Sequence, residues 1–566
     1  MKENFVSKIS HPGFKTGINI IFAGEDGGEW RIATKEIAST LSMFSSFGNN
    51  SFRLKEITRD NQYIECAKAR VLKNSFILNT RELSGLVHLP TSYVKTPGIN
   101  WLSSRSFEPP ANLPAIYSNE KNEITPLWKT NFRGSNTSFW ILPDDRRRHM
   151  YVIWKTGMGK STLLENMIID DIEKGRGVAL IDPHGDLAEA VIGYIPKNRT
   201  NQVIIFDPSD KEWPIAFNML EDVEPEHRTL VASGLIWIFK KIFWESWGPR
   251  LEHTLRNTIL ALLEYPNTTL ISIPLMLTSD AYRAKVVSKI TDPVVKKYWT
   301  AEFGKLNPSQ RTETINPILN KVWQFLSSPL LRNILGQPKN SFNLRWAMDN
   351  GKIIIVNLSK GKIGEDASSL LGAMLITKFQ LDAMSRANIA EKERKDFYLY
   401  VDEFQNFATD SFATILSEAR KYKLNLVMAN QYIDQMPDEV KGAVFGNVGS
   451  LVCFQIWPKD AKILKQALGS QVTEEDLWNI KKYTIYLREL VDGMPSSIFS
   501  AETFPPHKKE ESELKERYSK ILQVSREKYC KPRDLVVDKI AKMMENIEEI
   551  EHQKEKFIEE KKKGKK

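Results

Sequence analysis

The chain has 566 residues, of which 42% are apolar and 26% are charged, so disordered, collagen-like and disulfide-stapled miniature proteins are excluded. The formal net charge is +9, but seven lysines and three glutamates lie in residues 554–566, which leaves the rest of the chain close to neutral. Glycine supplies only 29 residues and tryptophan as many as 14, an imbalance relative to ordinary proteins.

The three cysteines predict a reducing compartment. Cys66, Cys453 and Cys530 are far apart and lack the paired spacing of a disulfide framework or a zinc knuckle. The first thirty residues lack a basic and then apolar signal pattern, and the longest apolar run, at 230–239, is too short to cross a bilayer. We therefore expect a cytoplasmic chain without a transmembrane segment.

The N-terminal part predicts a small α/β domain over residues 1–105. Residues 17–23 have the composition of a strand, and apolar residues at helical spacing follow from Thr34. Prolines and polar residues over 106–130 then predict an extended linker.

The central part has the pattern of an α/β domain with a mostly parallel sheet. Short β-rich runs alternate with turn residues and helices, as parallel sheets require. The predicted strands are 149–153, 177–182, 202–207, 352–358, 397–403, 425–431 and 450–456. Helical periodicity interrupts them, so we assign 131–222 and 336–505 to the sheet domain and 223–335 to an inserted all-helical domain.

The C-terminal part, 506–566, predicts a charged helical tail. A last strand or hairpin at 483–490 precedes it, and apolar positions are sparse among frequent Glu and Lys. A coiled coil or a partner-binding helix is one interpretation, but an exposed, solvated helix is favoured.

A phosphate-binding loop is predicted at 154–162, between an apolar strand and a helix. Backbone N–H groups and a helix N-terminus there would face an anion, with Lys160 on the β- and γ-phosphates and the Ser161 hydroxyl on Mg²⁺. The pattern departs at its first position, where Trp154 replaces the usual glycine. The loop residues assigned to the nucleotide are Thr156, Gly157, Met158, Gly159, Lys160, Ser161 and Thr162.

Adjacent carboxylates at the end of the 397–403 strand complete the predicted site. Asp402 would hold Mg²⁺ through water, and Glu403 would orient or deprotonate an attacking water. Gln431 closes the next strand, where it would either sense the γ-phosphate or only form a turn. Arg420 lies on the intervening helix, where position alone favours a surface residue over a contact with a neighbouring subunit.

With these pieces in order, the chain resembles the HerA/FtsK superfamily of DNA-pumping ATPases, and within it the TraG/TraD-like coupling proteins of type IV secretion. The resemblance covers roughly residues 130–505 and is specific as a set of motifs. The matching stretches are Asp145-Arg146-Arg147-Arg148-His149, Thr156 to Thr162, Asp182-Pro183-His184-Gly185-Asp186, Val401-Asp402-Glu403-Phe404, Glu418-Ala419-Arg420-Lys421 and Ala429-Asn430-Gln431.

The resemblance implies a RecA-like ATPase that uses ATP and Mg²⁺. Arg420 would complete the adjacent subunit's site, Gln431 would couple hydrolysis to movement, and Arg148 would contact nucleotide. A hexameric ring would hold single- or double-stranded DNA in a central channel without sequence preference and dock on membrane-embedded channel proteins at the inner face of the membrane. For Asp182 and His184 a structural turn is favoured.

Two alternatives to a DNA translocase stay open. One is a secretion-channel or pilus-assembly ATPase that does not act on DNA, and the other is a non-hydrolysing scaffold in which Trp154 has spoiled the loop. A further hypothesis explains the glycine deficit: UGA codons translated as tryptophan are read as glycine by the source organism. The positions concerned are Trp128, Trp140, Trp154, Trp244 and Trp457.

Overall fold

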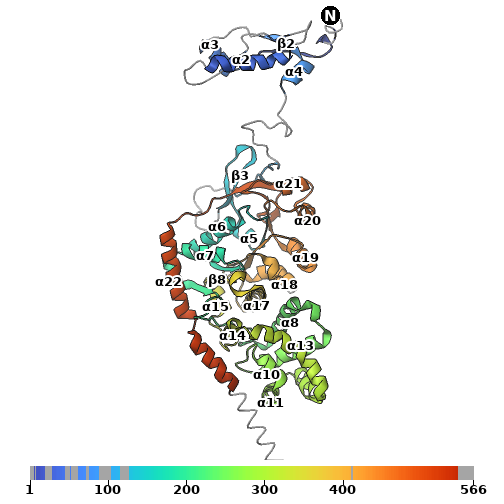
Figure 1. The fold of residues 1–566 in the computed structure, drawn as a ribbon, viewed down its shortest axis with the longest axis vertical. Helices are drawn as coiled ribbons and strands as arrows, with labels where there is room; N and C mark the ends of the chain where they lie inside the picture. The colour runs from blue at the N-terminus through green and yellow to red at the C-terminus, as the bar shows by residue number, and fades with distance from the viewer. Residues whose placement is uncertain are drawn as a thin grey trace, which may run out of the picture. The chain divides into compact units, whose positions relative to one another are not determined.

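The computed structural model describes residues 6, 8–19, 29–44, 51–52, 61–71, 75–87, 104–114, 126–409 and 412–545. The chain divides into two compact units, Met1–Trp101 and Leu102–Lys566 (Figure 1). No helix in these ranges is long and apolar enough to cross a membrane.

The first unit contains a two-stranded antiparallel sheet and short helices. Its described elements are β1 (Gly13–Thr16), α2 (Glu29–Leu41), η1 (Ser42–Phe44), α3 (Asn61–Lys68), β2 (Phe76–Asn79) and α4 (Thr80–Leu86). The strand predicted at 17–23 is wrong in its described part, because β1 ends at Thr16 and residues 17–19 are irregular; residues 20–23 lie outside the described residues. The helix predicted from Thr34 begins earlier, at Glu29.

The second unit is built on one eleven-stranded sheet, in the order β4-β3-β15-β12-β11-β5-β10-β9-β6-β8-β7. The strands from β11 to the last one, β7, run parallel to one another, and β12, β15, β3 and β4 pair antiparallel at the other end of the sheet. The predicted α/β fold with a mostly parallel sheet is therefore confirmed. The strands are β3 (Pro126–Thr130), β4 (Ser138–Trp140), β5 (Met150–Ile153), β6 (Gly177–Asp182), β7 (Val203–Phe206), β8 (Ile353–Asn357), β9 (Phe397–Val401), β10 (Leu424–Asn430), β11 (Ser450–Cys453), β12 (Thr484–Arg488) and β15 (Phe499–Thr503).

One boundary differs from the sequence prediction. Residues 126–130 were assigned to the linker, but they form β3, which pairs with β15 and β4. Trp128 in this strand is fully buried against Phe139, so packing against a distant strand overrides the turn-forming composition. A small hairpin of β13 (Leu490–Val491) and β14 (Met494–Pro495) follows β12.

Side chains of β5 alternate between two apolar layers, one on each face of the sheet. Tyr151 and Ile153 belong to the core shared with the helical segment, while Met150 and Val152 belong to the core under the helix that follows the loop. The helices around the sheet are α5 (Pro143–Arg146), α6 (Lys160–Glu173), α7 (Asp186–Tyr194), η3 (Lys197–Gln202), α16 (Lys360–Ile363), α17 (Glu365–Met384), η8 (Ser385–Asn388), η9 (Phe404–Asn406), α18 (Phe412–Glu418), η10 (Ala419–Tyr422), α19 (Asp438–Asn447), α20 (Pro458–Leu468) and α21 (Glu474–Trp478).

Every regular element between β7 and β8 is a helix, and these helices gather at the end of the second unit away from β3 (Figure 1). They are η4 (Pro225–His227), α8 (Arg228–Ile242), η5 (Trp244–Ser246), α9 (Pro249–Leu263), α10 (Ser272–Thr278), α11 (Asp280–Lys289), α12 (Pro293–Lys297), η6 (Tyr298–Glu302), η7 (Phe303–Lys305), α13 (Pro308–Leu326), α14 (Pro329–Leu335) and α15 (Leu344–Asp349). We refer to residues 223–335 as the helical segment.

The C-terminal part does not stand free in solvent as predicted. Helix α22 (Glu511–Tyr529) packs along α7 and β7, with Ile521 and Ser525 buried (Figure 1). Residues 533–545 are also helical, and Val536 and Ile540 are buried in the core shared with the helical segment. Few apolar residues are enough to hold these helices because each packs on an apolar surface formed by the rest of the second unit. Residues 546–566 lie outside the described residues.

Candidate nucleotide site

The predicted site residues meet at one edge of the sheet, which we call the carboxyl edge because the parallel strands end there. Lys160 follows β5, Asp402 and Glu403 follow β9, and Gln431 follows β10. Because β10 lies between β5 and β9, the three strand ends are neighbours in the sheet. Ligands of open parallel sheets bind at this kind of edge, where the strand order allows a crevice.

The loop between β5 and α6 turns on two glycines. Gly157 and Gly159 have φ of +84° and +109°, a backbone region that side chains with a Cβ rarely adopt. Trp154 directly follows β5 and has a negative φ, and its backbone N–H donates to the Asn430 carbonyl at 3.2 Å. The backbone at Trp154 therefore lies in a region of φ that residues with a Cβ adopt without strain.

The indole of Trp154 is 2% exposed and packs in the core beneath α6. The Lys160 ammonium lies 4.4 Å from its ring centroid. Among the other tryptophans of the glycine hypothesis, Trp128 and Trp140 are buried, whereas Trp244 and Trp457 are exposed. Three of the five indoles thus fill space that a glycine would leave empty.

Lys160 and Asp402 form a buried ion pair. The ammonium nitrogen lies 2.6 Å from both carboxylate oxygens, and both side chains are at most 8% exposed. Burial raises the pKa of Asp402 above its ordinary value, and the charge of Lys160 opposes that rise. Each charge is therefore neutralised by the other before any ligand binds.

Glu403 is held by side chains from three parts of the chain. Gln431 donates to one carboxylate oxygen at 2.8 Å, and Gln405 donates to the other at 2.6 Å. The His184 imidazole lies 3.7 Å from the first oxygen. Burial raises the pKa of Glu403, but the nearby His184 imidazole, the hydrogen bond from Gln405 and the charge of Lys160 outweigh it, so the pKa lies below its ordinary value. The carboxylate is consequently ionised and poised as an acceptor.

The structure adds two residues to the predicted set. Gln405 was missed, and its only sequence signal is its position two residues after Glu403. For His184 the sequence favours a turn residue, but the neighbouring Glu403 carboxylate raises the pKa of its imidazole. Asp182 does have a structural role: its carboxylate accepts the backbone N–H groups of His184 and Ala188, at 2.8 and 2.9 Å, at the start of α7.

Two predicted residues lie elsewhere. Arg420 precedes β10 and Arg148 precedes β5, so both lie at the opposite edge of the sheet, which we call the amino edge. The exposed Arg420 is close enough to His149 to affect its titration, since burial and then the charge of Arg420 lower the pKa of His149 to about 4. The structure therefore does not bring Arg148 or Arg420 to the phosphate loop of its own chain.

The remaining arginines of the same motif have structural partners. Arg146 is buried against Asp171 of α6, with nitrogen and oxygen 2.6 Å apart. Arg147 pairs with Asp396 at 2.7 Å. These ion pairs hold the start of β5 against its neighbours, and within the described ranges Arg148 is the arginine of the motif without such an ion pair.

The start of α6 fits a phosphate group and a bound Mg²⁺. Its first turn carries no acidic residue and no side-chain cap, so its backbone N–H groups are open to an anion, as the helix dipole favours. Ser161 is exposed there, and Asp402 lies next to Lys160. In the described ranges no three His, Cys, Asp or Glu residues cluster as a metal site.

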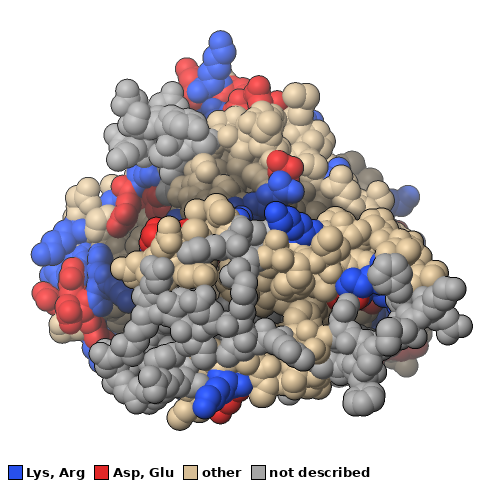
Figure 2. Space-filling view, turned by 90° about the horizontal axis from the view of Figure 1, so that it is seen from above, with Lys and Arg blue, Asp and Glu red and all other residues tan. Residues whose placement is uncertain are grey.

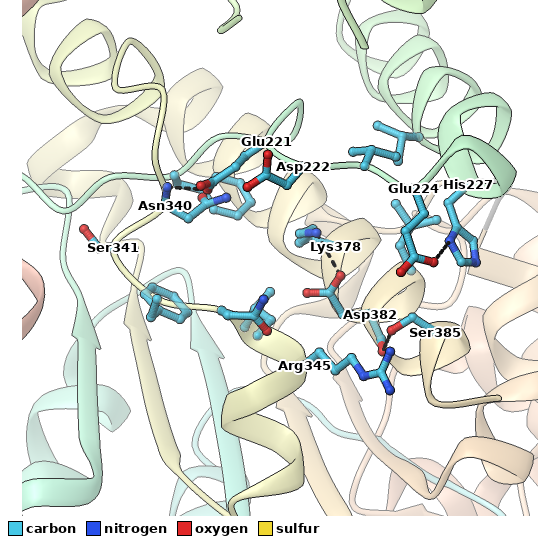
Figure 3. Close-up of a pocket in the computed structure, with 17 residues that line it drawn as sticks. Glu221, Asp222, Glu224, His227, Asn340, Ser341, Arg345, Lys378, Asp382 and Ser385 are labelled. Carbon is cyan, nitrogen blue, oxygen red and sulfur yellow. Dashed lines mark hydrogen bonds and ion pairs between the residues drawn. The ribbon is translucent and has the colours of Figure 1, made fainter. Parts of the chain in front are cut away.

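A cavity of about 560 Å³ lies away from this site, where the helical segment leaves the sheet domain and returns to it (Figure 3). Its wall carries both acidic and basic groups, among them Glu221, Asp222, Arg345 and the 2.8 Å pair of Lys378 and Asp382. It contains none of the predicted site residues.

A loop that turns on glycines at a helix start, with carboxylates at a nearby strand end, is the arrangement of P-loop ATPase domains. Residues 142–379 match the family model of the central domain of helicase HerA. This match covers less than half of the chain, and it agrees with the HerA part of the superfamily that the motifs resemble.

The curated protein sequences contain no significant match to the chain. Among solved structures, the plasmid coupling protein TrwB in complex with ADP and Mg²⁺ is 16% identical, with a TM-score of 0.47 over 73% of this chain and 97% of that one. VirB4 of Thermoanaerobacter pseudethanolicus is 15% identical, with a TM-score of 0.48 over 69% and 98%. The EccC cytoplasmic domain of Thermomonospora curvata is 11% identical, with a TM-score of 0.29 over 78% and 34%.

Proposed function

We propose that the chain is an ATP-driven DNA translocase that acts as the coupling ATPase of a conjugation or type IV secretion-like system. It assembles as a hexamer and hydrolyses ATP at sites built from two subunits. The proposal joins the HerA-type domain, the site at the carboxyl edge and the resemblance of residues 130–505 to coupling proteins.

The observation that carries the proposal is the placement of Arg420. Strand β10 has seven residues, so at about 3.3 Å per residue its two ends are about 20 Å apart. Arg420 lies before one end and Gln431 after the other, a gap that an arginine side chain does not span. If Arg420 completes a site, it must serve another subunit, and a head-to-tail contact gives a ring where its rotation closes.

The residues at the carboxyl edge have complementary roles in this proposal. Lys160 would hold the β- and γ-phosphates of a bound nucleotide in place of Asp402, and Asp402 and Ser161 would then be available to hold Mg²⁺. The metal ion supplies charge neutralisation on the phosphates. Glu403, ionised and fixed by two glutamines, orients the attacking water and takes its proton. Gln431 contacts this carboxylate and so links its position to β10.

The proposed DNA contact is a local one. In Figure 2 the lysine and arginine side chains of the described residues lie in small groups, several of them beside acidic side chains. Loops in a ring's channel need few basic groups per subunit because all subunits contribute to the same strand. The membrane-embedded channel proteins are partners of the proposed system.

The test is ATP hydrolysis by the full chain with and without single- and double-stranded DNA. Glu403→Gln is expected to lower kcat by roughly 10² to 10⁴ while nucleotide binding persists, because the base is lost and the loop is intact. Glu439→Gln, an exposed carboxyl on α19, is the control and should hydrolyse like the parent. A well-folded oligomer without ATPase activity would refute the enzyme and favour the scaffold.

The same assay separates the substrates. Hydrolysis that rises on addition of DNA supports the translocase. Hydrolysis that ignores DNA of both kinds refutes the DNA substrate and supports an ATPase that moves protein or pilus subunits.

A further inference from the structure

A lysine of the helical segment forms hydrogen bonds with the loop that follows Glu403. Lys241, in the last turn of α8, donates to the backbone carbonyls of Gln405, Asn406 and Ala408 at 3.3, 2.9 and 2.6 Å. The side chain is partly buried, and a charged donor makes stronger hydrogen bonds than a neutral one. The helical segment therefore holds the catalytic loop by its backbone.

This loop fixes the geometry of the Glu403 carboxylate. Glu403 itself has a φ of +46°, a left-handed conformation that the turn after it must maintain. Within the turn, Gln405 donates to the carboxylate at 2.6 Å, and the Asn406 N–H donates to the Glu403 carbonyl at 2.9 Å. Lys360 binds the Asn406 side chain at 2.9 Å. A shift of the carbonyls held by Lys241 would thus move the carboxylate.

Helix α8 is seated firmly enough to transmit such a shift. At Gly234 it approaches α17 so closely that a Cβ there would lie 2.6 Å from the Thr377 methyl group. Lys241 is seven residues further along, two helical turns on the same face. The same helix α17 packs its Gly372 against Phe407 of the loop. Helix α8, helix α17 and the loop therefore form one packed unit.

We propose that Lys241 is a positioning residue through which the helical segment sets the placement of Glu403. The inference rests on the proposed ATPase function, which it extends by naming how the inserted segment reaches the chemistry. A displacement of α8, whatever ligand of the helical segment causes it, changes the rate of hydrolysis. Binding of nucleotide does not depend on it, because the phosphate loop lies on β5 and α6, away from α8.

The experiment compares Lys241→Met with Lys240→Met in the full chain. Methionine is an unbranched side chain one atom shorter than lysine and carries no charge, and Lys240 of the same helix turn contacts the Trp237 ring instead. For Lys241→Met we expect kcat to fall by about tenfold to a hundredfold, since small misplacements of a catalytic group have effects of this size, with nucleotide affinity unchanged. Lys240→Met should match the parent, and Lys241→Arg, which keeps charge and donors, should recover most of kcat.

Hydrogen exchange of the Asn406, Phe407 and Ala408 amides gives a readout that needs no hydrolysis. These amides are bonded within the turn, so Lys241→Met should speed their exchange and Lys240→Met should not. If kcat and exchange in Lys241→Met both equal the parent, the proposal is wrong. A Lys241→Met chain that loses nucleotide affinity and thermal stability together also overturns it, since that marks general damage. A parent chain without ATPase activity refutes the proposed function, while the exchange rates still decide the coupling.

Discussion

Removal of the Arg420 guanidinium tests the two-subunit site. Arg420→Ala removes an exposed side chain that lies at the amino edge, about 20 Å of strand away from Gln431. Folding and nucleotide affinity of each chain should be preserved for that reason. An arginine finger contributes roughly 10³ to 10⁵ in kcat, so hydrolysis should fall by that factor, about 4 to 7 kcal/mol in barrier height. Lys421→Ala, the neighbouring exposed cation, serves as the control.

Mixing of two inactive variants decides between an action within one chain and an action between chains. Arg420→Ala keeps its phosphate loop, and Lys160→Ala keeps its arginine. In randomly mixed rings with head-to-tail contacts, about a quarter of the sites combine the intact loop of one chain with the intact arginine of the next. Mixed oligomers should therefore regain hydrolysis that neither variant shows alone. Full activity of Arg420→Ala, or no recovery on mixing under conditions in which subunits exchange, would refute the reasoning.

The other predictions concern His149 and Trp154. Burial lowers the pKa of His149 to about 4, from 6.5 in the unfolded chain, so the unfolded chain binds the proton at a higher pH than the folded one. The free energy of unfolding should therefore be unaffected by His149 above pH 6.5. Between pH 6.5 and pH 4 it should fall by up to about 1.4 kcal/mol per pH unit. His149→Asn should flatten this slope in urea unfolding, and an identical slope would contradict the assignment. Trp154→Gly should cost about 3 to 5 kcal/mol of stability by thermal unfolding because a packed indole is lost, with nucleotide affinity by calorimetry unchanged. Tighter nucleotide binding by the glycine variant would contradict the view that the loop with Trp154 binds nucleotide normally. A separate measurement, the intact mass of the protein from its own cells, shows whether glycine stands at the five tryptophan positions.

The strands of the ATPase domain and the residues of the carboxyl edge could be predicted from the sequence. Each strand is an apolar run that ends in a turn or a polar residue, so Asp402 and Gln431 mark strand ends without any knowledge of the fold. Parallel strands then place all such ends at one edge. The same reasoning also places Arg420 at the other edge, although the resemblance alone does not reveal that distance.

The contacts that the sequence did not predict are long-range or have no periodic signal. Lys241 and Gln405 are separated by 164 positions, and nothing in the local pattern of α8 marks one lysine over its neighbour. Helix α22 has few apolar residues, so its pattern resembles a solvated helix; its packing depends on a surface formed by α7 and β7. Tertiary context decided both cases.

Helix α22 also covers an edge of the sheet that a shortened chain would expose. Strand β7 is the last in the sheet, and the Ile205 N–H on its outer side donates to the Ser525 hydroxyl at 2.9 Å. A chain cut at residue 510 would expose an apolar strand with unpaired backbone groups, the kind of edge along which sheets of separate molecules join. The C-terminal helix thus protects this edge from aggregation. A chain shortened to the ATPase domain alone would become less soluble while its nucleotide site stayed intact.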